Sequence, residues 1–133
     1  MEGKIMRDLS ILHVDDELVV AEVCKIMLER MGAQVTVVID SLEALELFRQ
    51  KPRAFDLIIT DYDMPGIKGN ALAARAKGIR PDIPIILMTG HVELELDHMR
   101  AWGIDGILFK PCGRVDMQRK IAGLLGAEKA CAE

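Results

Sequence analysis

Short apolar runs rich in branched residues recur along this chain, and more polar stretches with helical spacing separate them. Four of these runs read as strands: Leu9–Val14, Leu57–Thr60, Pro84–Met88 and Gly106–Phe109. Continuous apolar runs of this length are typical of parallel strands that are covered on both faces. A fifth strand is expected at Gln34–Val38, after the break at Met31-Gly32.

Helices are predicted between these strands. Ser41 is expected to cap the second of them and Pro52 to end it, because Ser is a favoured N-cap and Pro cannot continue a helix. The segment from Asp61 to Gly69 contains two further breakers, Pro65 and Gly66, and is predicted to be a loop. The predicted helices are Leu18–Met31, Leu42–Gln50, Asn70–Lys77, His91–Trp102 and Val115–Leu125.

The helix at His91–Trp102 carries an ambiguous pattern. Apolar and acidic residues alternate over its first half as in a strand, but Val92, Leu96 and Met99 share one helical face. A crossover between parallel strands is usually helical, so we favour a helix with Leu94 and Ala101 pointing outward. The alternation then predicts an α/β fold, a doubly wound five-stranded parallel sheet in a three-layer sandwich.

Composition limits the protein further. Its 133 residues, half of them hydrophobic, suit a single domain with its core at about 9–126 and a tail at 127–133. The net charge of −4 comes from mixed charges without a basic stripe, so direct nucleic-acid binding is not expected. No run is long enough to span a membrane and the first residues lack a signal-peptide core, which favours a cytoplasmic protein. Cys24, Cys112 and Cys131 are widely spaced and are expected to be reduced.

Carboxylates follow two of the predicted strands. Asp15 and Asp16 follow the first, and Asp61 follows the third. Parallel strands end at one edge of a sheet, and three carboxylates gathered there repel each other unless a cation is bound. Oxygen ligands favour Mg²⁺, since no thiolate or imidazole pair lies nearby in the pattern. His13 lies inside an apolar strand and is expected to be packed and hydrogen-bonded rather than a metal ligand.

Other polar groups follow the last two strands. Thr89 offers a hydroxyl, Lys110 a cation, and the small Gly90 lets backbone N–H groups approach a ligand. A carboxylate nucleophile that attacks phosphorus forms an acyl phosphate, and these groups would neutralise charge on the phosphoryl oxygens. We therefore expect phosphoryl chemistry at this edge.

In combination, these positions resemble the response-regulator receiver domain of two-component signalling over about Leu9–Gly126. The resemblance implies a flavodoxin-like (βα)5 fold, phosphorylation of Asp61 by a histidine kinase or phosphotransfer protein, and Mg²⁺ held by Asp15, Asp16, Asp61 and the carbonyl of Asp63. It also implies phosphoryl contacts from Thr89 and Lys110 and a cis peptide before Pro111. The motifs that carry it are Ile11–Glu17, Asp61–Gly66, Met88–Gly90 and Phe109–Pro111.

The resemblance further implies a conformational switch. Activation would move Thr89 and repack an aromatic residue at the position held here by Ile107, with Phe109 as a partial substitute on the same strand face. We therefore expect signalling to rely on Thr89 and the helix after it. Asp63 and His91 would flank the path of attacking water and tune the lifetime of the acyl phosphate.

The expected protein is a regulator rather than an enzyme. The resemblance implies that it acts on a downstream protein or as a homodimer through the fourth helix, fifth strand and fifth helix. One alternative is a haloacid-dehalogenase-type phosphatase, because Asp61-Tyr62-Asp63 after an apolar strand also fits its Asp-x-Asp motif. Another is an interaction module that is never phosphorylated. The sequence leaves open whether the chain is part of a longer protein.

Overall fold

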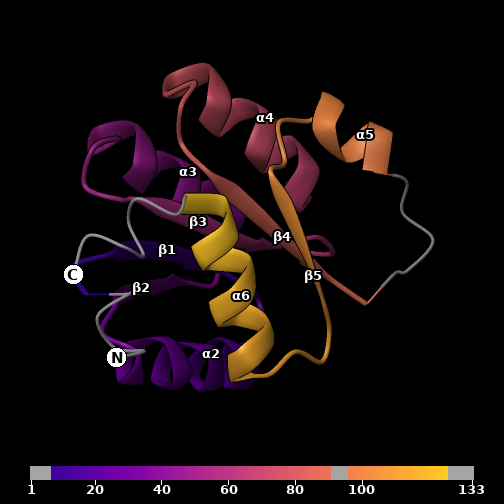
Figure 1. The fold of residues 1–133 in the computed structure, drawn as a ribbon. Coiled ribbons are helices and arrows are strands. Elements are labelled where there is room, and N and C mark those ends of the chain that lie inside the picture. Colours follow the sequence, from indigo (N-terminus) through magenta and orange to yellow (C-terminus); the bar gives the residue numbers. More distant parts are fainter. Residues whose placement is uncertain (1–6, 91–95, 126–133) are drawn as a thin grey trace.

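A five-stranded parallel sheet lies at the centre of the computed structural model, which describes residues 7–90 and 96–125. The strand order is β2-β1-β3-β4-β5, and every neighbouring pair runs parallel (Figure 1). The strands are β1 (Ser10–Val14), β2 (Gln34–Val38), β3 (Leu57–Asp61), β4 (Ile85–Thr89) and β5 (Gly106–Phe109). The predicted sheet is confirmed, with strand ends within one residue of expectation.

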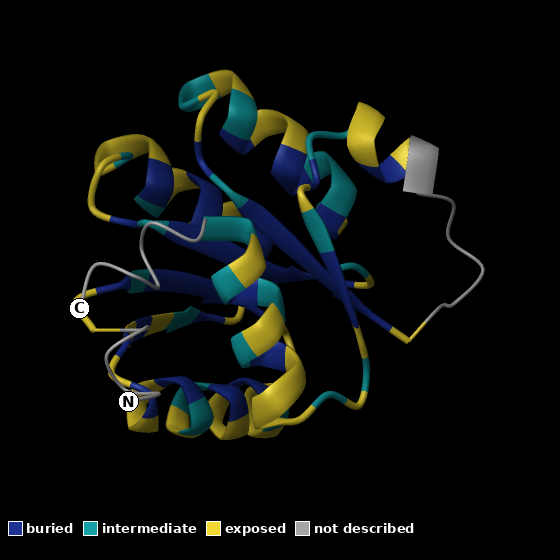
Figure 2. Cartoon of the chain, viewed as in Figure 1, coloured by how far each residue is buried: buried dark blue, intermediate teal, exposed yellow. Residues whose placement is uncertain are grey.

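Helices cover both faces of the sheet, which makes the predicted three-layer sandwich (Figure 1). On one face lie α3 (Ser41–Gln50), α4 (Gly69–Ile79) and α5 (Leu96–Ala101). On the other lie α2 (Leu18–Arg30) and α6 (Arg114–Leu125). Figure 2 shows the sheet as the buried centre of the molecule.

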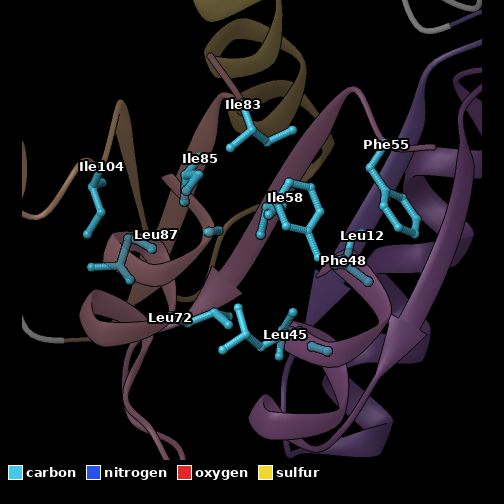
Figure 3. Close-up of a cluster of buried hydrophobic side chains, with 14 of the residues drawn as sticks. Leu12, Leu45, Phe48, Phe55, Ile58, Leu72, Ile83, Ile85, Leu87 and Ile104 are labelled. Atoms are coloured by element: carbon cyan, nitrogen blue, oxygen red, sulfur yellow. The ribbon is translucent and has the colours of Figure 1, made fainter. Parts of the chain in front are cut away.

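Successive strand residues point to opposite faces of the sheet and pack into two separate hydrophobic cores. Leu12 and Ile58 point toward α3 and α4, where Phe48 and Leu72 complete a core shown in Figure 3. Their strand neighbours face the opposite way and pack against α2 and α6, where Leu28 is fully buried. Strands buried on both faces need apolar residues at successive positions, which explains the continuous apolar runs of the sequence.

Glycine ends two of the helices at the chain reversals. After α2, Gly32 has φ of 102°, and the N–H of Ala33 reaches back to the carbonyl of Leu28 at 3.1 Å. After α5, Gly103 has φ of 86°, and the N–H of Ile104 bonds to the carbonyl of Met99 at 3.0 Å. Both reversals are Schellman motifs, in which a left-handed glycine satisfies the last carbonyls of the helix.

The expectation that Ser41 caps α3 is wrong by one residue. The cap is Asp40, whose side chain accepts from the N–H groups of Leu42 at 2.8 Å and Glu43 at 3.3 Å. A carboxylate at this position also complements the partial positive charge of the helix N-terminus. Ser41 is the first residue of the helix and is buried, with a different set of partners described below.

The ambiguous segment after β4 is only partly described. Helix α5 covers Leu96–Ala101, so the predicted helix is confirmed over its second half. Met99 is buried and Ala101 is exposed, as the helical spacing predicts. His91, Val92 and Leu94 lie outside the described residues.

Candidate functional site

The carboxyl ends of four strands bring the predicted polar residues to one edge of the sheet. The register pairs Asp61 of β3 with Met88 of β4, and Thr89 of β4 with Phe109 of β5. Asp15 directly follows β1, and its N–H bonds to the carbonyl of Val38 on β2 at 3.2 Å. These residues are therefore placed by backbone pairing within the sheet rather than by flexible loops.

Three carboxylates meet at this edge as the sequence predicts. Asp15, Asp16 and Asp61 each offer an oxygen, and these oxygens lie within 4.8 Å of one another. Asp15 is fully buried and Asp61 is 5% exposed, whereas Asp16 faces solvent. Oxygen atoms grouped in this way suit a hard divalent cation such as Mg²⁺.

Lys110 holds the carboxylates together. Its Nζ lies 2.8 Å from Oδ1 of Asp61 and 3.5 Å from Oδ2 of Asp15. Glu17, which belongs to the first predicted motif but was given no role of its own, lies 3.6 Å from the same ammonium group. The backbone N–H of Lys110 bonds to the carbonyl of Thr89 at 2.8 Å, which fixes the start of this loop against β4.

Burial and charge shift the ionisation of the pair. Burial raises the pKa of Asp61, and the charges of Asp15 and Asp16 raise it further. The hydrogen bond and charge of Lys110 lower it, but the net shift of the Asp61 pKa is upward. Burial alone would lower the pKa of Lys110, but its carboxylate partners outweigh this and raise it. Asp61 is thus a carboxylate held in a crowded acidic site and partly neutralised by one lysine.

The loop from β3 to α4 closes tightly around Asp61. The N–H of Gly69 bonds to the carbonyl of Tyr62 at 2.9 Å, and a Cβ on Gly69 would lie 2.3 Å from the carbonyl oxygen of Asp61. Asp63 is exposed, and its side chain accepts from Lys68 at 2.9 Å. Lys68 also lies over the ring of Tyr62, 5.7 Å from its centre.

The remaining predicted site residues lie on β4, on β5 and in the loops after them. Thr89 is buried at the end of β4, and the peptide between Lys110 and Pro111 is cis, as predicted. A Cβ on Gly90 would meet no described atom within 4 Å. Steric contact with the described residues therefore does not require a glycine at this position. Ile107 is buried in the core beside α3 and α4, whereas Phe109 is exposed. His91 lies outside the described residues.

His13 is packed inside its apolar strand, as predicted. The residue is fully buried, and neither ring nitrogen has a hydrogen-bond partner among the described residues. Burial lowers the pKa of His13 to about 4, with the nearby Ile59 backbone opposing a part of this shift and the charge of Lys110 adding to it. The imidazole is therefore neutral at physiological pH.

The two described cysteines are unbonded thiols, as expected. Burial raises the pKa of Cys24 to about 11 and also raises that of Cys112, so both thiols are protonated at neutral pH. Cys131 lies outside the described residues.

An apolar groove of about 450 Å³ adjoins the site, between α2 and the loop after β5. Lys110 and Pro111 form one wall, and Val19 and Val23 belong to the other. Four large apolar side chains of α2 are exposed, and Val19 is the most open of them at 76%. The four are Leu18, Val19, Val23 and Ile26, and we call them the α2 face.

Among the described residues, none of the helices has both the length and the apolar composition that crossing a bilayer requires.

Comparisons with known proteins agree with this geometry. The chain is 32% identical over 110 residues to "Transcription factor SKN7" of Chaetomium thermophilum, covering 82% of this chain and 14% of that protein. It is 35% identical over 123 residues to "Sensor histidine kinase AruS" of Pseudomonas aeruginosa, covering 89% of this chain and 12% of the kinase. The chain therefore spans a small part of the length of both relatives.

Solved structures show the same arrangement. A response regulator receiver domain protein from Clostridium thermocellum matches with a TM-score of 0.82 at 30% identity, over 92% of this chain and 98% of that one. The chemotaxis protein CheY4 of Vibrio cholerae matches with a TM-score of 0.80 at 27% identity, over 88% of this chain and 98% of that one. The family model described as "Response regulator receiver domain" matches residues 11–122, a range that contains the carboxyl end of every strand. The chain belongs to the response regulator receiver domain family.

Proposed function

We propose that Asp61 is the phosphoacceptor of this receiver domain and takes its phosphoryl group from a histidine kinase or phosphotransfer protein. The observation that carries the proposal is the placement of Lys110 Nζ 2.8 Å from Asp61 inside a cluster of three carboxylates. A lone carboxylate beside a lysine is a common ion pair, but a nearly buried one beside two further carboxylates is an arrangement built for a cation and an anionic substrate.

In the proposed reaction, a carboxylate oxygen of Asp61 attacks phosphorus. The new P–O bond forms while the P–N bond of the donor phosphohistidine breaks, and the electron pair of that bond returns to the imidazole. Lys110 then loses its ion pair with one Asp61 oxygen and binds a phosphoryl oxygen instead. Thr89, at the adjacent strand end, supplies a hydroxyl donor for a second oxygen, and the N–H groups around Gly90 approach the same phosphoryl group.

The acidic cluster fits the Mg²⁺ that receiver domains generally bind at such a pocket. We propose Asp15, Asp16, Asp61 and the carbonyl of Asp63 as its protein ligands, with Asp15 acting partly through water. When bound, Mg²⁺ supplies positive charge that offsets the carboxylates and the phosphoryl oxygens. Asp15 already uses one oxygen to accept from the N–H of Glu17 at 2.9 Å, which orients the carboxylate.

A phosphatase that turns over free substrates is the less favoured alternative. The Asp-x-Asp motif at Asp61 and Asp63 would need the second carboxylate as a general acid beside the first. Instead, the Asp63 side chain lies exposed and is paired with Lys68, while the partner of Asp61 is Lys110. This arrangement does not place Asp63 for the general-acid role that the phosphatase mechanism requires.

Intact-mass spectrometry after incubation with acetyl phosphate and Mg²⁺ tests the proposal. We expect one added phosphoryl group on the wild type, and none after Asp61→Asn or chelation of the metal. Asp56→Asn is a matched control, because Asp56 lies at the opposite end of the sheet, where it accepts from the N–H of Ser10. Labelling that survives Asp61→Asn would contradict the assignment.

A phosphate-release assay and a second phosphoryl donor separate the alternatives. Steady release of phosphate from generic phosphate esters would favour the phosphatase. Absence of labelling from both acetyl phosphate and phosphorylated phosphotransfer domains would favour an interaction module.

We propose the α2 face as the docking surface for the phosphoryl donor. Its groove shares Lys110 with the acidic site, so a protein seated there brings its phosphohistidine to Asp61. A homodimer on this surface would block the acceptor, which argues for a donor as the occupant. Val19→Glu should slow transfer from a phosphorylated phosphotransfer domain by about 10-fold or more, as for hot-spot residues, while leaving labelling by acetyl phosphate unchanged.

Leu42→Glu is the matched control, because Leu42 is also half exposed but lies on α3, over the other face of the sheet. Equal slowing by both variants, or slowing with acetyl phosphate as well, would contradict donor docking on α2.

For the output, we propose the face formed by α5, β5 and α6, used by a homodimer or by a downstream protein. β5 is one of the two edge strands of the sheet, Phe109 is 44% exposed there, and a groove of about 670 Å³ runs between β5 and α6. Asp116 and Lys120 on α6 give its rim charges of both signs.

A further inference from the structure

Ser41 connects α3 to the loop that follows Asp61. Its hydroxyl donates to the carbonyl of Pro65 at 3.2 Å and accepts from the N–H of Ile67 at 3.1 Å. The side chain is 2% exposed, so water does not compete for these bonds. One hydroxyl thus satisfies both backbone groups that flank Gly66.

The geometry of the loop explains why a small residue with a hydroxyl is needed. Gly66 has φ of 83°, and a Cβ on it would lie 3.0 Å from the Ser41 oxygen. The Ser41 hydroxyl therefore lies directly against the left-handed turn. Alanine at position 41 would leave a buried carbonyl and N–H without their partner, while keeping most of the volume.

The rest of the loop is fixed on either side of this contact. Met64 is 5% exposed and packs in the core beside α3 and α4, and the N–H of Gly69 closes the loop onto Tyr62. Asp63 lies between these anchors, two residues before the carbonyl that Ser41 binds. Its backbone therefore has little freedom to rotate as long as the Ser41 bonds are in place.

We propose that Ser41 is a positioning residue for the metal site, holding the loop so that the carbonyl of Asp63 faces the carboxylate cluster. The inference rests on the Mg²⁺ site of the proposed function. Asp40 caps α3, which leaves the hydroxyl of Ser41 free of any capping role. Among the described residues, the Ser41 hydroxyl bonds to the loop backbone, so its effect on the metal is exerted through the loop.

Mg²⁺ titration followed by amide NMR shifts of residues 61–69 tests the proposal without phosphorylation. Ser41→Ala should weaken Mg²⁺ binding by about 10-fold or more, the usual effect of losing a group that orients a ligand. Ser41→Cys should weaken Mg²⁺ binding similarly, because a thiol is a poor hydrogen-bonding group. The thiol also fills the space of the hydroxyl, so weaker binding in this variant cannot be attributed to a cavity. Both affinities are measured well below the unfolding temperature.

Ser10→Ala is the matched control, since Ser10 lies at the far end of β1 from the acidic cluster. It should bind Mg²⁺ like the wild type. Wild-type Mg²⁺ affinity in folded Ser41→Ala and Ser41→Cys would overturn the proposal, even if both were less thermostable, and so would a wild type that binds no Mg²⁺. If the wild type binds Mg²⁺ but is never phosphorylated, the proposed function fails while the Ser41 comparison still decides this inference.

Discussion

At the scale of single residues, His13 gives the protein a pH-dependent stability. Its pKa is about 4 in the folded protein and 6.5 when exposed, so the unfolded chain binds more protons between these values. The stability is therefore complete above pH 6.5 and is lost as the pH falls toward 4. Between pH 8 and pH 5 we expect the His13 contribution to fall by about 2 kcal/mol.

Urea unfolding of the wild type and His13→Leu at both pH values measures this. The variant should lose less stability than the wild type on acidification, because a leucine has no proton to bind. His98→Gln is the matched control, since it removes an exposed imidazole instead of a buried one. If His13→Leu and the wild type lose the same stability, burial of His13 does not set the pH response.

Asp61 should destabilise the metal-free protein. Its pKa is raised in the fold, so the folded state favours the neutral form, and stability falls as the pH rises above about 3.8 through the folded value. Asp61→Asn should therefore raise the thermal midpoint at pH 7 without metal, although Lys110 loses a charged partner. Addition of Mg²⁺ should stabilise the wild type more than the variant.

Scanning calorimetry with and without Mg²⁺ measures both effects. A metal-free Asp61→Asn that is less stable than the wild type would mean that the Lys110 ion pair outweighs the burial and crowding of the carboxylate.

The positions of the site residues at the strand ends could be predicted from the sequence, but the long-range contacts that hold the neighbouring loop could not. Asp15, Asp61 and Thr89 each follow an apolar run, and parallel strands bring such positions to one edge whatever the loops do. The role of Ser41 depends on a contact with residues 24 and 26 positions away. Helix-start statistics favoured Ser41 as a cap, and no local pattern reveals its long-range partners.

At the scale of elements, two glycines of α4 should respond in opposite ways to alanine. A Cβ on Gly69 would lie 2.3 Å from the Asp61 carbonyl, so Gly69→Ala must displace β3 or the helix. Gly78 has open space around it, and Gly78→Ala should stabilise the helix by about 0.5 kcal/mol through its better helix propensity. We expect Gly69→Ala to lose about 1 to 3 kcal/mol, in the range of overpacked sites.

Urea unfolding gives both values, and acetyl phosphate labelling adds a second readout. Gly69→Ala should also label more slowly because the Asp61 backbone shifts, whereas Gly78→Ala should label normally. Normal labelling of a destabilised Gly69→Ala would show that the helix moves instead of the strand end.

Element types and ends were mostly predictable because local chemistry determines them. Gly32 and Pro52 mark real helix ends, and strand limits follow the apolar runs. The segment before α5 was harder, since its apolar residues fit both periods and only tertiary packing selects one. In the described part, α5 covers Leu96–Ala101 and Met99 on it is buried, as the helical spacing predicts.

At the scale of the whole molecule, Thr89 lies between the acidic cluster and the proposed output face. The backbone of Thr89 pairs with Phe109 and accepts from the N–H of Lys110, so Thr89 joins the acidic cluster to the end of β5. Ile107 is already buried and has no aromatic ring to reorient. Binding of trifluoroberyllate with Mg²⁺ should therefore change amide hydrogen exchange around Thr89, at 96–101 and at 106–109, with a small change at Ile107.

Thr89→Ala provides the decisive comparison, because it removes the hydroxyl while leaving the strand backbone intact. If the hydroxyl carries the signal, the variant should still bind the phosphoryl analogue, as judged by exchange at Asp61, yet lose the changes on α5 and β5. Thr36→Ala, on the opposite edge strand β2, should keep them. Equal changes on α5 and β5 in the wild type and Thr89→Ala would mean that Lys110 transmits the signal, since its ammonium group contacts Asp61 and its backbone is bonded to β4.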